Sequence, residues 1–158
     1  MIAFEGQNMD NCIFCRIAAG EIPSAKVYEG ERAVAFLDAA PMSKGHLLVV
    51  PRTHWADLAA VPGAGATDGE RAAYAEVCNV VRAAARAARE VFGGGANVLQ
   101  CTGEEAGQTV GHLHFHVIPR PKGGKIPPDF VSGAFSYASD AEREAVAAAL
   151  REAIAKAL

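Results

Sequence analysis

The sequence predicts a single globular domain in which helices and β-strands are mixed. Its 158 residues suffice for one domain of ordinary size with a buried core. Apolar residues make up 51% of the chain and charged residues 21%, a balance typical of folded proteins and not of disordered ones. Short apolar runs interrupted by glycine and proline occur together with two long alanine-rich segments. Residues 1–158 show no internal repeat and no second domain.

Five short segments predict strands, because each is largely apolar and is bounded by turn residues. They are residues 26–29, 33–38, 46–51, 97–101 and 111–119. The third segment is interpreted as a buried strand that stops at Pro51, since proline cannot donate to a strand ladder. His46 begins this strand and is interpreted as a surface or packing residue.

Three segments predict helices, and they cover residues 12–20, 70–92 and 139–158. Gly20 closes the first of them. The second carries apolar residues at three- and four-residue spacing until a run of three glycines ends it. The third opens with Ser139 and Glu142 in the pattern of a capping box. Its apolar stripe consists of Val146, Leu150, Ile154 and Leu158.

The charge and the apolar runs exclude several classes of protein. A net charge of −3 argues against nucleic-acid binding through a broad basic surface. No apolar run approaches the roughly 20 residues that span a membrane, and the first residues lack the basic start of a secretory signal. We therefore expect a cytoplasmic protein with no membrane or nucleic-acid partner. In that compartment the four cysteines are expected to be mostly reduced.

Three histidines alternate along the run Gly111–Pro119 and carry the strongest chemical signal. Because strand side chains alternate between two faces, His112, His114 and His116 are expected on one face and the intervening apolar residues on the other. Clustered imidazoles offer bases, nucleophiles and metal ligands. A strand face of polar histidines with satisfied hydrogen bonds is the plainer alternative.

The loop that precedes these histidines is rich in small residues. Gly107 lets the backbone approach a ligand closely, and successive N–H groups in such a loop can bind an anion. Gln108 and Thr109 add side-chain donors. An imidazole nitrogen beside bound phosphate can attack phosphorus and form a covalent intermediate. Loop and histidines together favour chemistry at a phosphate.

A second constellation is the pair Cys12 and Cys15, which are separated by two residues. Such a pair is redox-active, metal-binding or incidental. Zinc requires four ligands, so a zinc site would need two further residues from elsewhere in the chain.

The segment Gly107-Gln108-Thr109-Val110-Gly111-His112-Leu113-His114-Phe115-His116-Val117-Ile118 resembles the signature of the histidine-triad nucleotide-binding proteins. The resemblance extends upstream to residues 12–23, 35–38 and 45–54, and covers about residues 12–120 in matching order. It implies an α+β fold with an antiparallel sheet, a long helix and a C-terminal helix. It also implies a homodimer.

The resemblance implies hydrolysis or transfer at the α-phosphate of a purine nucleotide through a nucleotidyl-histidine intermediate. Nucleoside phosphoramidates or dinucleoside polyphosphates would be the substrates and AMP the product. His114 would be the nucleophile, and His112 and His116 would orient it and contact the phosphate or leaving group. The phosphate would also bind Gly107, Gln108 and Thr109, while Asp38 would accept hydrogen bonds from the ribose hydroxyls. The purine pocket would consist of Ile13, Phe14, Ile17, Ile22, Phe36 and Leu37, each of which also suits plain core packing.

Bacterial-type members of this family are similar to the chain at the cysteine pair. In them the pair joins two histidines that correspond to His54 and His112, which implies a structural zinc held by Cys12, Cys15, His54 and His112. Catalysis would need no metal.

One position departs from the family pattern. Cys101 stands where many members have an asparagine that helps to hold the phosphate. This departure motivates an alternative function, a nucleotide-binding or scaffolding protein with weak or vestigial activity. A further alternative is a hydrolase that uses the histidines as ligands of a catalytic zinc.

Overall fold

The computed structural model describes residues 11–125 and 135–158. It contains five strands in one sheet: β1 (Lys26–Glu29), β2 (Ala33–Leu37), β3 (Leu47–Pro51), β4 (Gly95–Leu99) and β5 (Phe115–Arg120). The spatial order is β1-β2-β3-β5-β4, and every neighbouring pair is antiparallel. The helices are α1 (Ile13–Ala18), α2 (Asp68–Phe92) and α3 (Asp140–Ala157), with a short 3-10 turn η1 (Glu104–Ala106). This arrangement confirms the predicted α+β fold with an antiparallel sheet.

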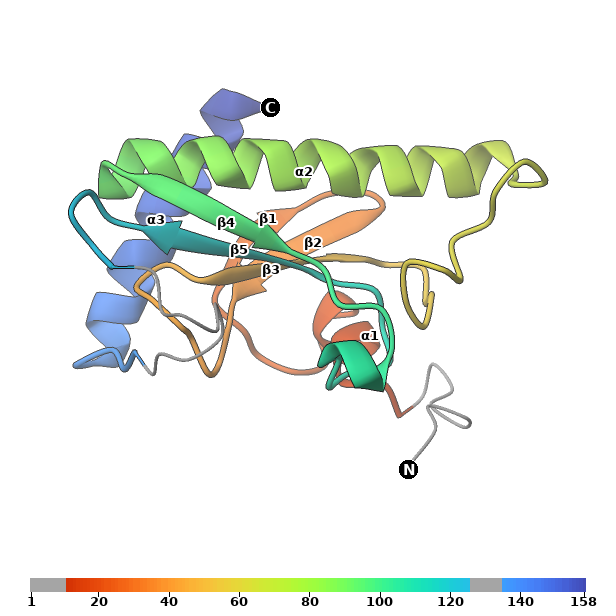
Figure 1. Cartoon of the computed structure of the whole chain (residues 1–158), viewed down its shortest axis with the longest axis horizontal. Coiled ribbons are helices and arrows are strands. Elements are labelled where there is room, and N and C mark those ends of the chain that lie inside the picture. Colours follow the sequence, from red (N-terminus) through yellow and green to blue (C-terminus); the bar gives the residue numbers. More distant parts are fainter. Residues whose placement is uncertain (1–10, 126–134) are drawn as a thin grey trace.

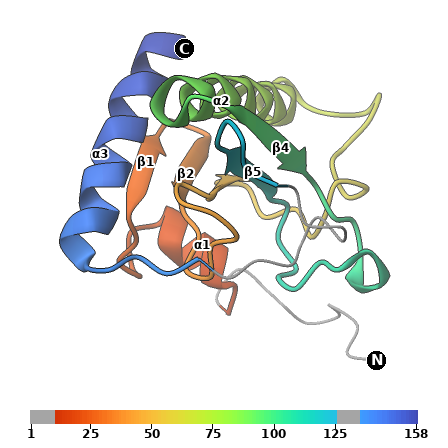
Figure 2. The same ribbon diagram turned by 60° about the vertical axis from the view of Figure 1, so that its left-hand side comes forward.

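The two faces of the sheet have different coverings, because consecutive strand residues point in opposite directions. Odd-numbered residues of β2 and β3 belong to a core cluster shared with α2 and α3, whereas even-numbered ones pack with α1. Figures 1 and 2 show α2 along one side of the sheet with α3 beside it, and α1 on the other side. The sheet therefore has a structural face under two long helices and a second face against which, among the described helices, the short α1 packs.

The long helices follow their sequence signals closely. Thr67 caps α2, with a full capping box to Glu70, so the helix begins two residues before the predicted start. Ser139 caps α3 by accepting from the backbone N–H of Glu142. The predicted stripe of α3 is buried at its first three positions, but Leu158 is 51% exposed because the helix ends before it can pack.

Two predicted strands are placed differently by the structure. β4 begins at Gly95 and ends at Leu99, two residues earlier than predicted, because its pairing with β5 sets the register. The histidine run lies only partly in β5. The N–H of Leu113 donates to the carbonyl of Trp55 over 2.7 Å, outside the sheet ladder, so His112 and His114 precede the strand.

No helix in the described part of the chain combines the length and apolarity that a membrane crossing requires.

Candidate active site and metal centre

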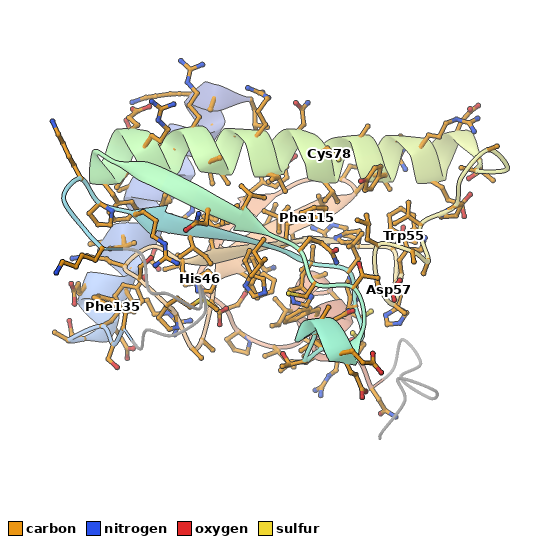
Figure 3. All side chains as sticks on the ribbon, viewed as in Figure 1. His46, Trp55, Asp57, Cys78, Phe115 and Phe135 are labelled. Atoms are coloured by element: carbon orange, nitrogen blue, oxygen red, sulfur yellow. The ribbon has the colours of Figure 1, made fainter. Side chains whose placement is uncertain are left out.

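Four imidazoles gather on the sheet face that α1 covers. His112 and His46 are fully buried, His114 is 3% exposed and His116 is half-buried. The ring centroids of His114 and His116 lie 5.0 Å apart, and those of His46 and His116 lie 5.2 Å apart. Figure 3 labels His46, which directly precedes β3. The expected common face of the three triad histidines is present, and His46 joins it.

The hydrogen bond of His114 fixes which of its nitrogens carries the proton. Its Nδ1 lies 2.7 Å from the carbonyl oxygen of His112, and a carbonyl can only accept, so Nδ1 carries the hydrogen. The lone pair of neutral His114 is then at Nε2. Burial lowers the pKa of His114 below its ordinary value, although the bond to His112 and the charge of Asp38 oppose this shift. His114 thus has the tautomer and charge of a nucleophile.

His46 similarly fixes the tautomer of His116. The backbone N–H of Met42 donates to Nδ1 of His46 over 3.0 Å, which leaves the hydrogen of that ring on Nε2. This Nε2 lies 2.9 Å from Nδ1 of His116, which must therefore accept. Neutral His116 then carries its own hydrogen on Nε2. His46 is not a surface residue: it is a buried packing residue, and its hydrogen bond to the triad was not predicted from the sequence.

Asp38 lies beside this pair. Its Oδ2 is 3.5 Å from Nε2 of His46 and 4.0 Å from Nδ1 of His116, and its backbone N–H donates to the carbonyl of His46. Burial, together with the nearby His114 and His46 rings, lowers the pKa of His116 to about 4, while Asp38 opposes the shift. Burial also lowers the pKa of His46. The cluster is therefore neutral apart from one carboxylate.

The loop before the triad is held together from inside by Gln108. The side-chain Oε1 accepts from the N–H of Gly103, and Nε2 donates to the carbonyls of Ala56 and Val110, over 2.7 to 2.8 Å. Both amide hydrogens are thus donated to backbone carbonyl groups. The structure places Gln108 as the residue that shapes the loop, in contrast to the direct phosphate contact that we expected. Thr109 is exposed at the loop surface.

Two glycines set the loop conformation. Gly103 and Gly107 have φ values of +89° and +87°, which other residues rarely adopt. Cys101 is half-buried beside this loop as a free thiol. The hydroxyl of neighbouring Thr102 is hydrogen-bonded to Gln100 over 2.7 Å.

The expected purine-pocket residues divide between the two sheet faces. Phe14 and Phe36 pack edge to face at 5.6 Å, and the Phe14 ring lies 5.2 Å from that of His114. The apolar cluster that contains Phe14 and Phe36 also includes Ile17 and Ile22. The side chain of Ile13, the first residue of α1, is 47% exposed. Leu37 lies in the core under α2 and α3, because it follows Phe36 and points the other way. Leu37 therefore cannot line a pocket shared with Phe14.

The four expected metal ligands converge from separate segments. Nδ1 of His112 lies 3.4 Å from the sulfur of Cys12 and 3.4 Å from that of Cys15, and Cys15 is 3.3 Å from Nδ1 of His54. All four ligand atoms lie within 4.8 Å of one another. Tetrahedral zinc with ordinary bond lengths places sulfur and nitrogen about 3.6 Å apart.

The protonation states of this cluster suit a zinc ion. Nε2 of His112 donates to the carbonyl of Pro51 over 2.9 Å, so its Nδ1 presents a lone pair to the two sulfurs. Burial and the neighbouring Cys12 raise the pKa of the Cys15 thiol to about 12 in the metal-free protein. A bound cation is what would hold both cysteines as thiolates. Donor set and geometry therefore fit zinc.

Asp38, His46 and His116 form a second group with converging ligand atoms. Here the hydrogen-bond pattern opposes a metal. Nε2 of His46 carries the ring hydrogen, because Nδ1 accepts a hydrogen bond from the N–H of Met42. A metal bound at Nε2 would move that hydrogen to Nδ1 and break the hydrogen bond to Met42. A catalytic zinc at the histidines is thus disfavoured.

Trp55 directly follows the candidate metal ligand His54, and the charge of Arg120 acts on the buried ring of His46. Trp55 packs with Ala73 and Leu113 beneath α2, which places it in a small core. The Nε of Arg120 donates to the side chain of Asn97 across β4 and β5.

Comparison with known proteins agrees with this geometry. A family model described as the HIT domain matches residues 19–123. The chain is 47% identical to Protein hit of Bacillus subtilis over 70% of this chain and 72% of that one. It is 37% identical to an adenosine 5′-monophosphoramidase of Schizosaccharomyces pombe over 70% of this chain and 75% of that one.

A solved structure extends the likeness through the C-terminal helix. A zinc-bound histidine triad family protein from Mycobacterium smegmatis is 35% identical and superposes with a TM-score of 0.71, covering 94% of this chain and 96% of that one. Sequence, fold and the convergence of the triad with the Cys2His2 cluster agree, and the chain belongs to the HIT family.

Proposed function

We propose that this protein hydrolyses adenosine 5′-phosphoramidates through a nucleotidyl-His114 intermediate and releases AMP. The observation that carries the proposal is the bond from Nδ1 of His114 to the carbonyl of His112, which leaves Nε2 as a free nucleophile on a buried ring. The likeness to adenosine 5′-monophosphoramidases favours a phosphoramidate over a dinucleoside polyphosphate as substrate.

In the first step Nε2 of His114 attacks the α-phosphorus and the bond from phosphorus to nitrogen breaks. The leaving nitrogen is already protonated in a phosphoramidate zwitterion and departs as an amine. The phosphorylated ring is a cation with its hydrogen on Nδ1, and the carbonyl of His112 accepts that hydrogen. The same hydrogen bond thus orients the nucleophile and stabilises the intermediate.

His116 has a different task in this step. With Nδ1 accepting from His46, its Nε2–H is available to donate to a phosphoryl oxygen as negative charge develops there. The backbone N–H of Gly107 donates to the carbonyl of Glu104, so the added donor from this loop would be Thr109, while Gly107 would let the loop backbone approach the phosphate. Water then attacks phosphorus, the bond to His114 breaks, AMP leaves, and the released proton passes to the departed amine.

The proposed nucleotide lies across the face that α1 covers. Phe14 and Phe36, with Ile13, Ile17 and Ile22, provide apolar surface for the base. Asp38 accepts from the ribose hydroxyls. We further propose that the Cys2His2 cluster binds one structural zinc, which cross-links the α1 segment to the triad.

We also propose that the protein forms a homodimer. β4 is an edge strand of the sheet, and the side chain of Val98 in it is 47% exposed. A second copy would pair with this edge and cover that apolar surface. Light scattering on the purified protein would give twice the chain mass.

AMP release from adenosine 5′-phosphoramidate tests the enzyme. We expect turnover by the wild-type protein and a loss of at least about a thousandfold in His114→Ala, because no other group is placed to attack. Turnover by His114→Ala at a similar rate would contradict the proposal.

A second candidate is a nucleotide-binding protein with weak activity, which Cys101 favours because a thiol donates and accepts weakly beside the loop. Tight AMP binding by the wild-type protein without turnover, and a gain of turnover in Cys101→Asn, would establish this second function.

A further inference from the structure

A polar pocket lies next to the proposed nucleotide site, between the end of β2 and the start of α3. Its volume is about 400 Å³. Asp38 and Ala39 form one wall, and the wall opposite comes from Ser136, Tyr137, Ser139 and Arg143. Asp38 thus borders both this pocket and the histidine cluster, where its Oδ2 lies 3.5 Å from His46.

Among the described residues that line this pocket, Arg143 is the one cation. Its Nε is buried and has no hydrogen-bond partner, and no hydrogen bond or ion pair of its guanidinium is formed with any part of the chain that the structure describes. Asp140 lies one turn earlier on α3 and does not pair with it. Arg151, farther along α3, is by contrast bonded to the carbonyl of Lys26 and paired with Glu144. A buried guanidinium N–H without an acceptor is costly, and an anionic ligand in this pocket would satisfy it.

The other groups of the lining leave room for that anion. Oδ1 of Asp38 accepts from the N–H of Ala40, and its Oδ2 faces His46. Asp140 is exposed, so water screens its charge. The hydroxyl oxygen of Ser139 accepts from the N–H of Glu142 and retains its own hydrogen for donation. An arginine fork and a hydroxyl donor together suit a phosphate group.

The position of the pocket indicates where such a phosphate would be attached, and this step rests on the proposed function. With the α-phosphate at His114 and the ribose hydroxyls at Asp38, a group on the 2′ or 3′ oxygen extends past Asp38 toward Arg143. The other ribose hydroxyl remains free to donate to Asp38. We propose that Arg143 binds a phosphate on the 2′ or 3′ oxygen, so that the enzyme prefers adenine nucleotides that carry this second phosphate.

Calorimetric titration of the full-length protein tests the preference with three stable ligands: AMP, adenosine 2′,5′-bisphosphate and adenosine 3′,5′-bisphosphate. We expect one bisphosphate to bind about tenfold more tightly than AMP, since a charge-assisted bidentate contact is gained. Arg143→Gln should reduce that ratio at least fivefold. Arg151→Gln, the same change on the same helix, should preserve it, and thermal melting would verify that both variants are folded.

The outcomes separate the two proposals. If AMP binds and neither bisphosphate binds more tightly, or if the preference survives in Arg143→Gln, the phosphate subsite is overturned while the nucleotide site stands. If the wild-type protein binds none of the three ligands, the proposed nucleotide site is overturned together with the subsite.

Discussion

The carbonyl oxygen of His112 lies 2.7 Å from Nδ1 of His114, so the residue that faces the cysteine pair also fixes the tautomer of the candidate nucleophile. The ring of His112 is itself held at both nitrogens, by Pro51 at Nε2 and by the two sulfurs near Nδ1. The candidate zinc site and the proposed nucleophile are therefore joined through a single residue. A displacement of His112 would move the acceptor that orients His114.

Loss of one zinc ligand should consequently impair catalysis as well as stability. We expect wild-type protein to contain about one zinc per chain and Cys15→Ser to contain much less, with kcat reduced about tenfold or more. Elemental analysis and steady-state kinetics on the same samples would measure both. Cys78→Ser, an exposed cysteine on α2, is the matched control and should change neither. Unchanged kcat in a zinc-free Cys15→Ser would contradict the coupling.

Removal of the His46 side chain should remove the constraint on the tautomer of His116. In wild-type protein we expect the hydrogen of neutral His116 on Nε2, because Nδ1 accepts from His46. In His46→Ala this constraint is lost. The free energy of unfolding should also fall by about 2 kcal/mol or more, because Nδ1 of His116 is left buried without a donor and a cavity replaces the ring. ¹⁵N NMR of labelled histidines would report the tautomer. A wild-type His116 protonated at Nδ1 would refute the assignment.

Stability should decrease as the pH falls below the ordinary histidine range. Burial lowers the pKa of His116 in the folded protein from its ordinary value of 6.5 to about 4, so the unfolded chain binds its proton first as the pH falls. Its contribution is fully present above pH 6.5 and is lost progressively as the pH falls toward 4. Thermal melting between pH 7.5 and 4 should show a smaller decline in His116→Gln than in the wild-type protein. Equal declines would argue against a buried neutral ring.

We expect Gln108 to affect stability and nucleotide binding by holding the loop in shape, and not by contacting the ligand. Gln108→Leu deletes three buried hydrogen bonds, so we expect a loss of about 2 to 4 kcal/mol in the free energy of unfolding and a raised KM. Gln100→Leu is the control, since within the described residues the Gln100 side chain bonds to its close sequence neighbours Cys101 and Thr102. Denaturant unfolding and kinetics measure the two effects. A stable Gln108→Leu with a raised KM would indicate direct ligand contact instead.

The parts of the fold that the sequence predicts well are those governed by local signals. The cap at Ser139 places the start of α3 to within one residue, and apolar periodicity places the start of α2 to within two, although the capping box at Thr67 was not predicted. Strand alternation places the triad on one face and explains why Phe36 and Leu37 separate. The boundaries of β4 depend on pairing with β5, which no local pattern encodes.

The same distinction applies to the site. The spacing of the triad and of the cysteine pair is visible in the sequence, but the role of His46 arises from a contact between residues 70 positions apart. The pairing of Leu48 with His116 brings the residues just before β3 beside β5, and only that register reveals the contact. Likewise, the orientation of the Gln108 side-chain amide depends on its hydrogen bond to the carbonyl of Ala56, 52 residues upstream.

The central claim is that Nε2 of His114 forms a bond to the α-phosphorus. Rapid-quench mass spectrometry of the intact protein, after brief mixing with adenosine 5′-phosphoramidate, tests it directly. The account predicts a transient mass increase of one adenylyl group that maps to His114 in the digested protein and is absent from His114→Ala. AMP release by wild-type protein with no adduct at the earliest times, or with an adduct on another residue, would contradict it.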